Sequence, residues 1–309
     1  MQATHLDASP SATPSEPDWL DRNAYPFQSH SLALPDGRMH YVDEGSGEPV
    51  LFVHGTPTWS FEYRGLIQPV RGFRRAIAPD HLGFGLSERP EHFEYTPEAH
   101  ARALAAFVDR LGLERFALVV HDFGGPIALP LALAQPERIS RLVVINSFLW
   151  PLDADKALAK NAQLAASELG RMLYRHLNAP LRLVMPSAFF DRNKLTPDLH
   201  RQYLSVFPDG DSRERVLWQL ARCLLGSGDF YARLWQRREA LRGIPALIVW
   251  GMQDPAFNPQ HLRRWQRALP DAEVLDVGDA GHWPHEEQPQ LVGDAVRRFL
   301  RAEAASARS

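Results

Sequence analysis

The sequence Val120-His121-Asp122-Phe123-Gly124-Gly125 joins an apolar run to an alanine-rich one. Phe116 to Val120 are apolar and partly β-branched, which is typical of a short strand buried in a parallel sheet. Pro126 to Gln135 are rich in alanine and leucine, which predicts a buried helix. Proline fits the first turn of a helix, because the N–H that it lacks would have no partner there. A strand that passes into a helix through Asp-Phe-Gly-Gly predicts a nucleophile elbow, a sharp turn that exposes the Asp122 side chain.

Asp122 taken alone allows two interpretations, because an aspartate between a strand and a helix is often only the helix N-cap. Three further apolar runs each end just before a polar residue of interest: Leu51–Val53 before His54-Gly55, Ala246–Gly251 before Asp254, and Val274–Val277 before His282. The chain therefore carries a nucleophile, an acid and a histidine in the order of α/β-hydrolase triads. We predict that Asp122, Asp254 and His282 form a catalytic triad.

Strand signals and helical periods alternate through most of the chain. This alternation predicts a mostly parallel central sheet with helices on both faces, and the order of the triad implies that the sheet has the α/β-hydrolase fold. We expect residues 18–147 and 242–300 to form this core. The runs Arg38–Val42 and Val50–His54 are expected to pair as a hairpin across Gly45-Ser46-Gly47.

Between residues 148 and 241 the strand signals vanish, and helical runs separated by prolines take over. This pattern predicts a helical cap inserted between a sixth and a seventh strand, above the active site. The segment is rich in aromatic residues, most of which we expect to pack the cap itself while a minority make the pocket apolar. The residues that we expect in the substrate pocket are Trp59, Trp150, Phe189, Trp218 and Trp235.

The two ends of the chain are expected to lie outside the fold. Residues 1–17 are polar and rich in serine and proline, which predicts a disordered tail and not a secretory signal. Residues 301–309 are expected to be a flexible C-terminus. No stretch approaches the roughly 18 apolar residues of a membrane-spanning helix, so no membrane span is predicted.

Composition narrows the function further. The formal net charge of −3 provides no basic surface for nucleic acid, so an apolar small molecule is the expected partner. Cys223 is the sole cysteine, which excludes an internal disulfide and favours a cytoplasmic location. Neither a metal-ligand spacing nor a phosphate loop is present in the sequence, so we predict neither a metal nor a cofactor. The oligomeric state stays open.

Four segments resemble the haloalkane dehalogenases and their close relatives: His54-Gly55-Thr56-Pro57-Thr58-Trp59-Ser60, Pro79-Asp80-His81-Leu82-Gly83-Phe84-Gly85-Leu86-Ser87, His121-Asp122-Phe123-Gly124-Gly125 and Asp279-Ala280-Gly281-His282. The resemblance runs from about Asp18 to Leu300 and is least specific between Leu152 and Arg237. The closest branch of that family includes enzymes that decarboxylate cis-β-lactones to olefins. More distant relatives include epoxide hydrolases, which share the aspartate nucleophile.

A carboxylate nucleophile restricts the reaction to alkyl electrophiles. Attack of Asp122 on an ester or amide would give a less stable anhydride, whereas attack on a saturated carbon gives a stable alkyl ester. His282 is expected to activate a water that hydrolyses this ester, and Asp254 to orient His282. The backbone N–H groups of Thr56 and Phe123 are expected to form the oxyanion hole.

Several polar residues near these motifs are expected to be supports. Asp80 and His81 are expected to brace a loop, and His54 and His121 to form structural hydrogen bonds. Glu286 and Glu287 are expected in the first turn of the last helix.

Two departures from the family bear on the substrate. The resemblance implies that halide is held by a tryptophan directly after the nucleophile and, in most branches, by an asparagine after His-Gly. Here these positions are Phe123 and Thr56. Loss of one transition-state donor costs on the order of 10²–10³ in rate, so we expect inefficient dehalogenation unless a cap tryptophan such as Trp218 or Trp235 replaces it.

Three other functions therefore stay open. A cis-β-lactone decarboxylase has a carboxylate leaving group, which needs a halide cradle less. An epoxide hydrolase needs cap tyrosines to protonate the opening oxygen, for which Tyr174, Tyr203 and Tyr231 are candidates. A non-catalytic ligand receptor is disfavoured by the complete triad.

Overall fold

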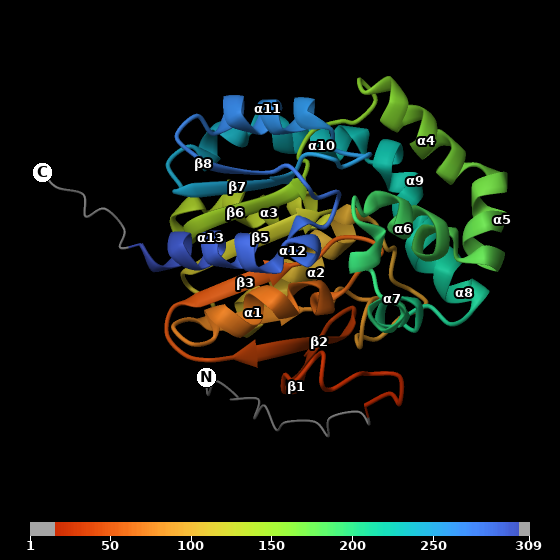
Figure 1. The fold of residues 1–309 in the computed structure, drawn as a ribbon, viewed down its shortest axis with the longest axis horizontal. Helices are drawn as coiled ribbons and strands as arrows, with labels where there is room; N and C mark the ends of the chain where they lie inside the picture. The colour runs from red at the N-terminus through yellow and green to blue at the C-terminus, as the bar shows by residue number, and fades with distance from the viewer. Residues whose placement is uncertain (1–15, 303–309) are drawn as a thin grey trace, which may run out of the picture.

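An eight-stranded sheet in the order β1-β2-β4-β3-β5-β6-β7-β8 forms the centre of the computed structural model (Figure 1), which describes residues 16–302. The strands are β1 (Ser29–Leu34), β2 (Gly37–Glu44), β3 (Pro49–Val53), β4 (Arg75–Pro79), β5 (Phe116–Asp122), β6 (Ile139–Ser147), β7 (Ala246–Gly251) and β8 (Glu273–Val277). The pairs β1–β2 and β2–β4 are antiparallel, and the other pairs are parallel. The predicted mostly parallel sheet is thus confirmed.

Helices cover both faces of the sheet. On one face α1 (Arg64–Val70) packs against α13 (Pro289–Arg301), and on the other α2 (Pro97–Arg110) packs against α3 (Gly124–Ala134) (Figure 1). Two further helices, α11 (Pro259–Ala268) and the short α12 (Pro284–Glu287), follow β7 and β8. Every residue of β5 is buried, as expected of a central parallel strand that is covered on both sides.

The predicted hairpin between Arg38–Val42 and Val50–His54 is wrong. β2 lies between β1 and β4, and β3 lies between β4 and β5, so that β4 separates the two expected partners. The hairpin instead joins β1 and β2, with Leu34 opposite Gly37. Gly45 and Gly47 lie in the turn that connects β2 to β3, a parallel strand nearer the middle of the sheet.

The chain between β6 and β7 is helical, which confirms the inserted cap. Its helices are α4 (Lys156–Ala166), α5 (Glu168–Leu177), α6 (Met185–Ala188), α7 (Pro197–Leu204), α8 (Gly210–Ser212), α9 (Gln219–Gly226) and α10 (Gly228–Gln236). Helices α4 to α9 lie together beyond one end of the sheet (Figure 1). Helix α10 packs against α3, so this last part of the expected 148–241 segment belongs to the layer that covers the sheet.

The ends of the described chain differ slightly from expectation. Arg301 is the last residue of α13, and its guanidinium lies 4.4 Å from the centre of the Phe73 ring. Of the expected tail, 1–17, only Glu16 and Pro17 are described, and residues 303–309 also lie outside the described part. Within residues 16–302, none of the helices has both the length and the apolar character that crossing a bilayer requires.

Candidate active site

The nucleophile elbow forms where β5 passes into α3. Asp122 has φ +48°, a left-handed conformation that residues with a side chain adopt rarely. A Cβ on Gly124 would lie 2.1 Å from the Val53 carbonyl oxygen, and one on Gly125 would lie 2.1 Å from Oγ of Ser147. Only glycine therefore lets α3 begin this close to β3 and β6, and the strained turn holds the Asp122 carboxylate at the end of the sheet.

The loop after β3 supplies a donor to this carboxylate. The backbone N–H of Thr56 donates a hydrogen bond to Oδ1 of Asp122 at 2.9 Å. A Cβ on Gly55 would lie 2.4 Å from the same oxygen, so glycine is required for the loop to approach. Within residues 16–302, no hydrogen bond joins the N–H of Phe123 to the carboxylate, and its role in the oxyanion hole stays a prediction.

The structure brings the predicted triad together. Nδ1 of His282 lies 2.8 Å from Oδ2 of Asp254, and Nε2 of His282 lies 3.6 Å from Oδ2 of Asp122. Asp254 also accepts hydrogen bonds from Nδ2 of Asn146 at 2.8 Å and from the backbone N–H of Ala256 at 2.7 Å. This order of contacts is that of a nucleophile, a base and an orienting acid.

The charges of the triad depend on one another. Burial opposes a positive charge on His282, but the carboxylates of Asp254 and Asp122 outweigh it and raise its pKa to about 10. Burial likewise opposes the charge on Asp254, but His282 and nearby backbone N–H groups hold the pKa of Asp254 below its ordinary value. With both carboxylates ionised, His282 is therefore an imidazolium at neutral pH.

The backbone of His282 is fixed on both sides. Its N–H donates to the carbonyl of Ala188 in the cap at 2.9 Å, and its carbonyl accepts from Nε2 of His121 at 2.9 Å. The preceding Gly281 leaves no room for a Cβ, which would lie 2.1 Å from the same Ala188 oxygen. The base thus contacts both the cap and the core.

Sequence comparison identifies the family. Residues 48–289 match the family model described as alpha/beta hydrolase fold. The chain is 35% identical over 278 residues to haloalkane dehalogenase 2 of Mycobacterium tuberculosis, a match that covers 89% of this chain and 96% of that one. The chain is a haloalkane dehalogenase-like α/β-hydrolase.

One further sequence relative and one solved structure also resemble this hydrolase. It is 33% identical over 283 residues to the cis-3-alkyl-4-alkyloxetan-2-one decarboxylase of Shewanella oneidensis, and the match covers 89% of each chain. The crystal structure of haloalkane dehalogenase DbeA from Bradyrhizobium elkani matches with a TM-score of 0.81 at 25% identity, over 89% of this chain and 97% of that one. The predicted resemblance is confirmed, and the hydrolase is an enzyme of the haloalkane dehalogenase type.

Three residues that were expected to be supports form buried hydrogen bonds or ion pairs around the site. The expected helix of two of them was wrong. Asp80 accepts hydrogen bonds from the backbone N–H groups of Ser60 and Leu86, both at 2.9 Å. Glu286 and Glu287 lie in the separate short helix α12 and not in the last helix, because Pro289 begins α13. Glu286 forms a bidentate ion pair with Arg64, and Glu287 accepts from the N–H of Gly281 at 2.7 Å.

One of the five expected pocket residues, Phe189, contacts an aromatic ring that itself contacts the triad. Phe189 stacks on Trp283 with ring centres 5.3 Å apart, and the Trp283 ring lies edge-on to His282 at 4.5 Å. Trp218 is turned to the cap itself, where its N–H donates to the Ala165 carbonyl at 3.1 Å. This contact occupies the indole N–H, and the expected place of the Trp218 ring in the pocket stays a prediction.

The other three expected pocket residues have contacts with residues outside the triad. Trp59 packs on Phe61 and donates from its N–H to the Gln202 carbonyl at 3.3 Å. Trp150 and Trp235 pack on each other, with ring centres 5.0 Å apart, and both lie under the guanidinium of Arg264. These contacts leave the expected pocket role of the three tryptophans a prediction.

Two residues that the sequence did not single out complete the site. Asn146 has φ +29° at the end of β6 and donates to Asp254. Trp283 contacts His282, and its buried N–H has no hydrogen-bond partner within residues 16–302. A polar residue at the end of an apolar strand and an aromatic residue next to the base were the available signals.

Proposed function

We propose that this hydrolase opens an apolar alkyl electrophile by forming an alkyl ester on Asp122. The observation that carries the proposal is the environment of this carboxylate, which has one oxygen bonded to the Thr56 N–H and the other facing His282. Attack on a saturated carbon uses the carboxylate as a nucleophile and releases the leaving group with the bonding electrons. The Thr56 N–H is then placed to stabilise the oxyanion when water attacks the ester carbonyl.

Ester formation also changes the role of His282. While Asp122 is ionised, the two carboxylates keep the pKa of His282 raised and the ring protonated. An ester carries no charge, so alkylation removes the contribution of Asp122 and lowers the pKa of His282. This change favours the neutral ring, which is the form that can accept a proton from water. Asp254 keeps the ring oriented throughout.

The residues around Asp122 favour a leaving group that needs no side-chain N–H. The Phe123 ring packs edge-on against Phe148, with ring centres 5.4 Å apart, and it contains no donor. Thr56 offers only a hydroxyl on a short arm, and the N–H of Trp218 is occupied by Ala165. We therefore propose that efficient dehalogenation is not the native reaction, although the alkylation chemistry is that of the dehalogenases.

Decarboxylation of a cis-β-lactone is the second candidate, favoured by the same lack of halide donors and by the Shewanella relative. Attack of Asp122 on the ring carbon that bears oxygen breaks the C–O bond and releases a tethered carboxylate. Loss of carbon dioxide then supplies the electron pair of the double bond, and the Asp122 carboxylate departs. These reaction steps consume no water and need no general base. The role of His282 in decarboxylation would therefore differ from its role in hydrolysis.

Epoxide hydrolysis has less support. Tyr203 is fully buried and donates its hydroxyl to Glu286, and the hydroxyl of Tyr231 donates to the Cys223 carbonyl at 2.8 Å. Two of the three candidate acids thus have acceptors of their own, and Tyr174 stays a candidate. A non-catalytic receptor is disfavoured because the triad is assembled in working order.

Intact-mass measurement of the His282→Gln variant tests the proposal. Incubation with 1-bromohexane should add one hexyl group, stable for hours, because the ester forms but no base activates water. The matched double variant His282→Gln with Asp122→Asn should add nothing. A wild-type chain that turns over a substrate while His282→Gln neither accumulates an ester nor loses activity would overturn the roles of Asp122 and His282. Lactone decarboxylation that persists in His282→Gln would support the second candidate.

A further inference from the structure

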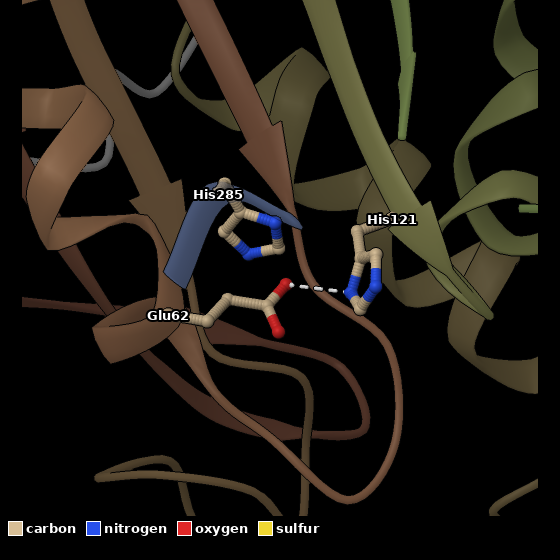
Figure 2. A group of neighbouring side chains, drawn as sticks. All are labelled: Glu62, His121 and His285. Atoms are coloured by element: carbon tan, nitrogen blue, oxygen red, sulfur yellow. Dashed lines mark ion pairs between the residues drawn. The ribbon is translucent and has the colours of Figure 1, made fainter. Parts of the chain in front are cut away.

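A second polar cluster lies directly behind the catalytic histidine. Glu62 comes from the 3-10 helix η1 (Ser60–Tyr63), His121 from β5 and His285 from α12 (Figure 2). The three side chains point toward one another, and each residue is at most 2% exposed. One ligand atom of each lies within 4.8 Å of the others.

The hydrogen bonds of His121 leave its second nitrogen facing an acceptor. Nε2 of His121 lies 2.9 Å from the carbonyl oxygen of His282, so Nε2 carries a proton. In the neutral ring Nδ1 then has a lone pair, and this atom faces Oε1 of Glu62 at 3.3 Å. Two acceptors in this position repel each other unless a positive charge lies between them.

The cluster also contains unpaired polar atoms. Within residues 16–302, no hydrogen-bond partner is present for Oε1 of Glu62, Nδ1 of His121 or either nitrogen of His285. Buried polar groups are nearly always paired with protein, water or an ion. One of these atoms from each residue can meet a single bound ion, and the second nitrogen of His285 needs a partner of its own.

We propose that Glu62, His121 and His285 bind a divalent transition-metal ion of the zinc class. Two imidazoles and a carboxylate are a donor set that zinc accepts, with a fourth position left for water, whereas calcium and magnesium prefer oxygen alone. Bonds of about 2.0–2.1 Å to a tetrahedral ion place neighbouring ligand atoms about 3.3 Å apart. The separation of Nδ1 of His121 and Oε1 of Glu62 has this value. All three ligand atoms lie within 4.8 Å of one another, so binding requires the His285 ring to move closer to the other two.

The surroundings of the cluster match those of a metal site. A histidine that binds metal through one nitrogen usually donates its other N–H to a carbonyl or carboxylate, as His121 does to the carbonyl of His282. The second oxygen of Glu62 accepts the hydroxyl of Thr58, which fixes the carboxylate. The ion would hold His121 and, through it, the backbone of His282, so it would position the base and take no part in the reaction.

Metal content of the intact protein tests the proposal. Protein purified from zinc-supplemented culture and then desalted should contain about one zinc ion per chain. Elemental mass spectrometry measures this content. Protein produced with Co²⁺ should show the visible absorption bands of a low-symmetry site with nitrogen ligands. Glu62→Gln and His285→Gln should each lose the ion and the bands. The matched control is His100→Gln, because His100 is a buried histidine outside the cluster whose two nitrogens also find no hydrogen-bond partner in the described part of the chain.

Two results would overturn the site. One is a wild-type chain without stoichiometric zinc or Co²⁺ bands, which would mean that a proton on His121 neutralises Glu62. The other is equal retention of zinc by both cluster variants and the wild type. If the variants do not fold, the wild-type chain decides: its melting temperature should fall on prolonged treatment with a chelator and recover with zinc alone. A melting temperature unchanged by either treatment contradicts the proposal.

Discussion

Asn146 donates a hydrogen bond from Nδ2 to Oδ2 of Asp254 at 2.8 Å, the same carboxylate oxygen that Nδ1 of His282 contacts. The amide oxygen of Asn146 accepts from the N–H of Gly251 at 2.7 Å. One buried amide therefore ties the end of β6 to the end of β7 and sets the orientation of the acid.

We predict that Asn146→Ala lowers kcat by roughly tenfold with little change in KM. The reason is that Asp254 loses a buried donor, worth about 1–3 kcal/mol, and orients His282 less well. Steady-state kinetics on the best substrate checks this outcome. Asn178→Ala is the matched control, because Asn178 is also buried, has φ +51° and ends α5. It should lower the melting temperature without lowering kcat, and equal losses of kcat in both variants would contradict a specific role of Asn146.

Asp122→Asn should abolish turnover of every substrate, because an amide does not form the ester. Its melting temperature should change little, because the amide oxygen of asparagine can still accept the Thr56 N–H and asparagine tolerates the left-handed conformation. Asp155→Asn is a suitable control, because Asp155 caps α4 and asparagine caps helices equally well. Substantial turnover by Asp122→Asn would disprove the nucleophile assignment.

The double variant Phe123→Trp with Thr56→Asn should raise turnover of bromoalkanes at least tenfold, because each new N–H can stabilise the leaving halide. The indole must displace the Phe148 ring, so Phe123→Leu, which adds space but no donor, is the control. The wild type should show little quenching of tryptophan fluorescence by bromide. Fast bromoalkane turnover by the wild type with clear quenching would contradict the proposed substrate class, because it would require a tryptophan beside the bound halide.

His100 should make the fold sensitive to acid. Burial lowers the pKa of His100 to about 3, below the value of about 6.5 in an unfolded chain. The unfolded state then binds an extra proton between these values, so stability falls as pH drops from 6.5 toward 3. At pH 5 this costs about 2 kcal/mol relative to pH 8. Urea unfolding at both pH values should show that His100→Phe loses less stability than the wild type, and equal losses would argue against this prediction.

The catalytic residues were the part of the structure best predicted from the sequence, because each of them lies at or after the end of a strand. Asp122, Asp254 and His282 each follow an apolar run, and carboxyl ends of parallel strands meet at one edge of a sheet, so their meeting could be predicted. Strand pairing was less accessible: the loop after β2 has hairpin glycines, but nothing local shows that β4 will insert between β2 and β3.

The pocket and the second cluster could not be read from the sequence for related reasons. An aromatic residue in a cap helix can face either way, and the N–H of Trp218 reaches a backbone carbonyl that only the folded cap places there. Glu62, His121 and His285 come from three distant segments without a ligand spacing. Their convergence is a property of the tertiary structure alone.

The hydrogen bond between the His282 N–H and the Ala188 carbonyl has a consequence for building chimaeras of this enzyme. Ala188 is the last residue of α6, so a cap residue contacts the backbone of the base directly. The same Ala188 carbonyl leaves no space for a side chain at Gly281. A cap transplanted from a relative would bring its own backbone at this point and could displace the base without altering any triad residue. A crossover that replaces α4 and α5 but keeps 185–190 together with 279–287 avoids this conflict and allows substrate range to be exchanged separately from catalysis.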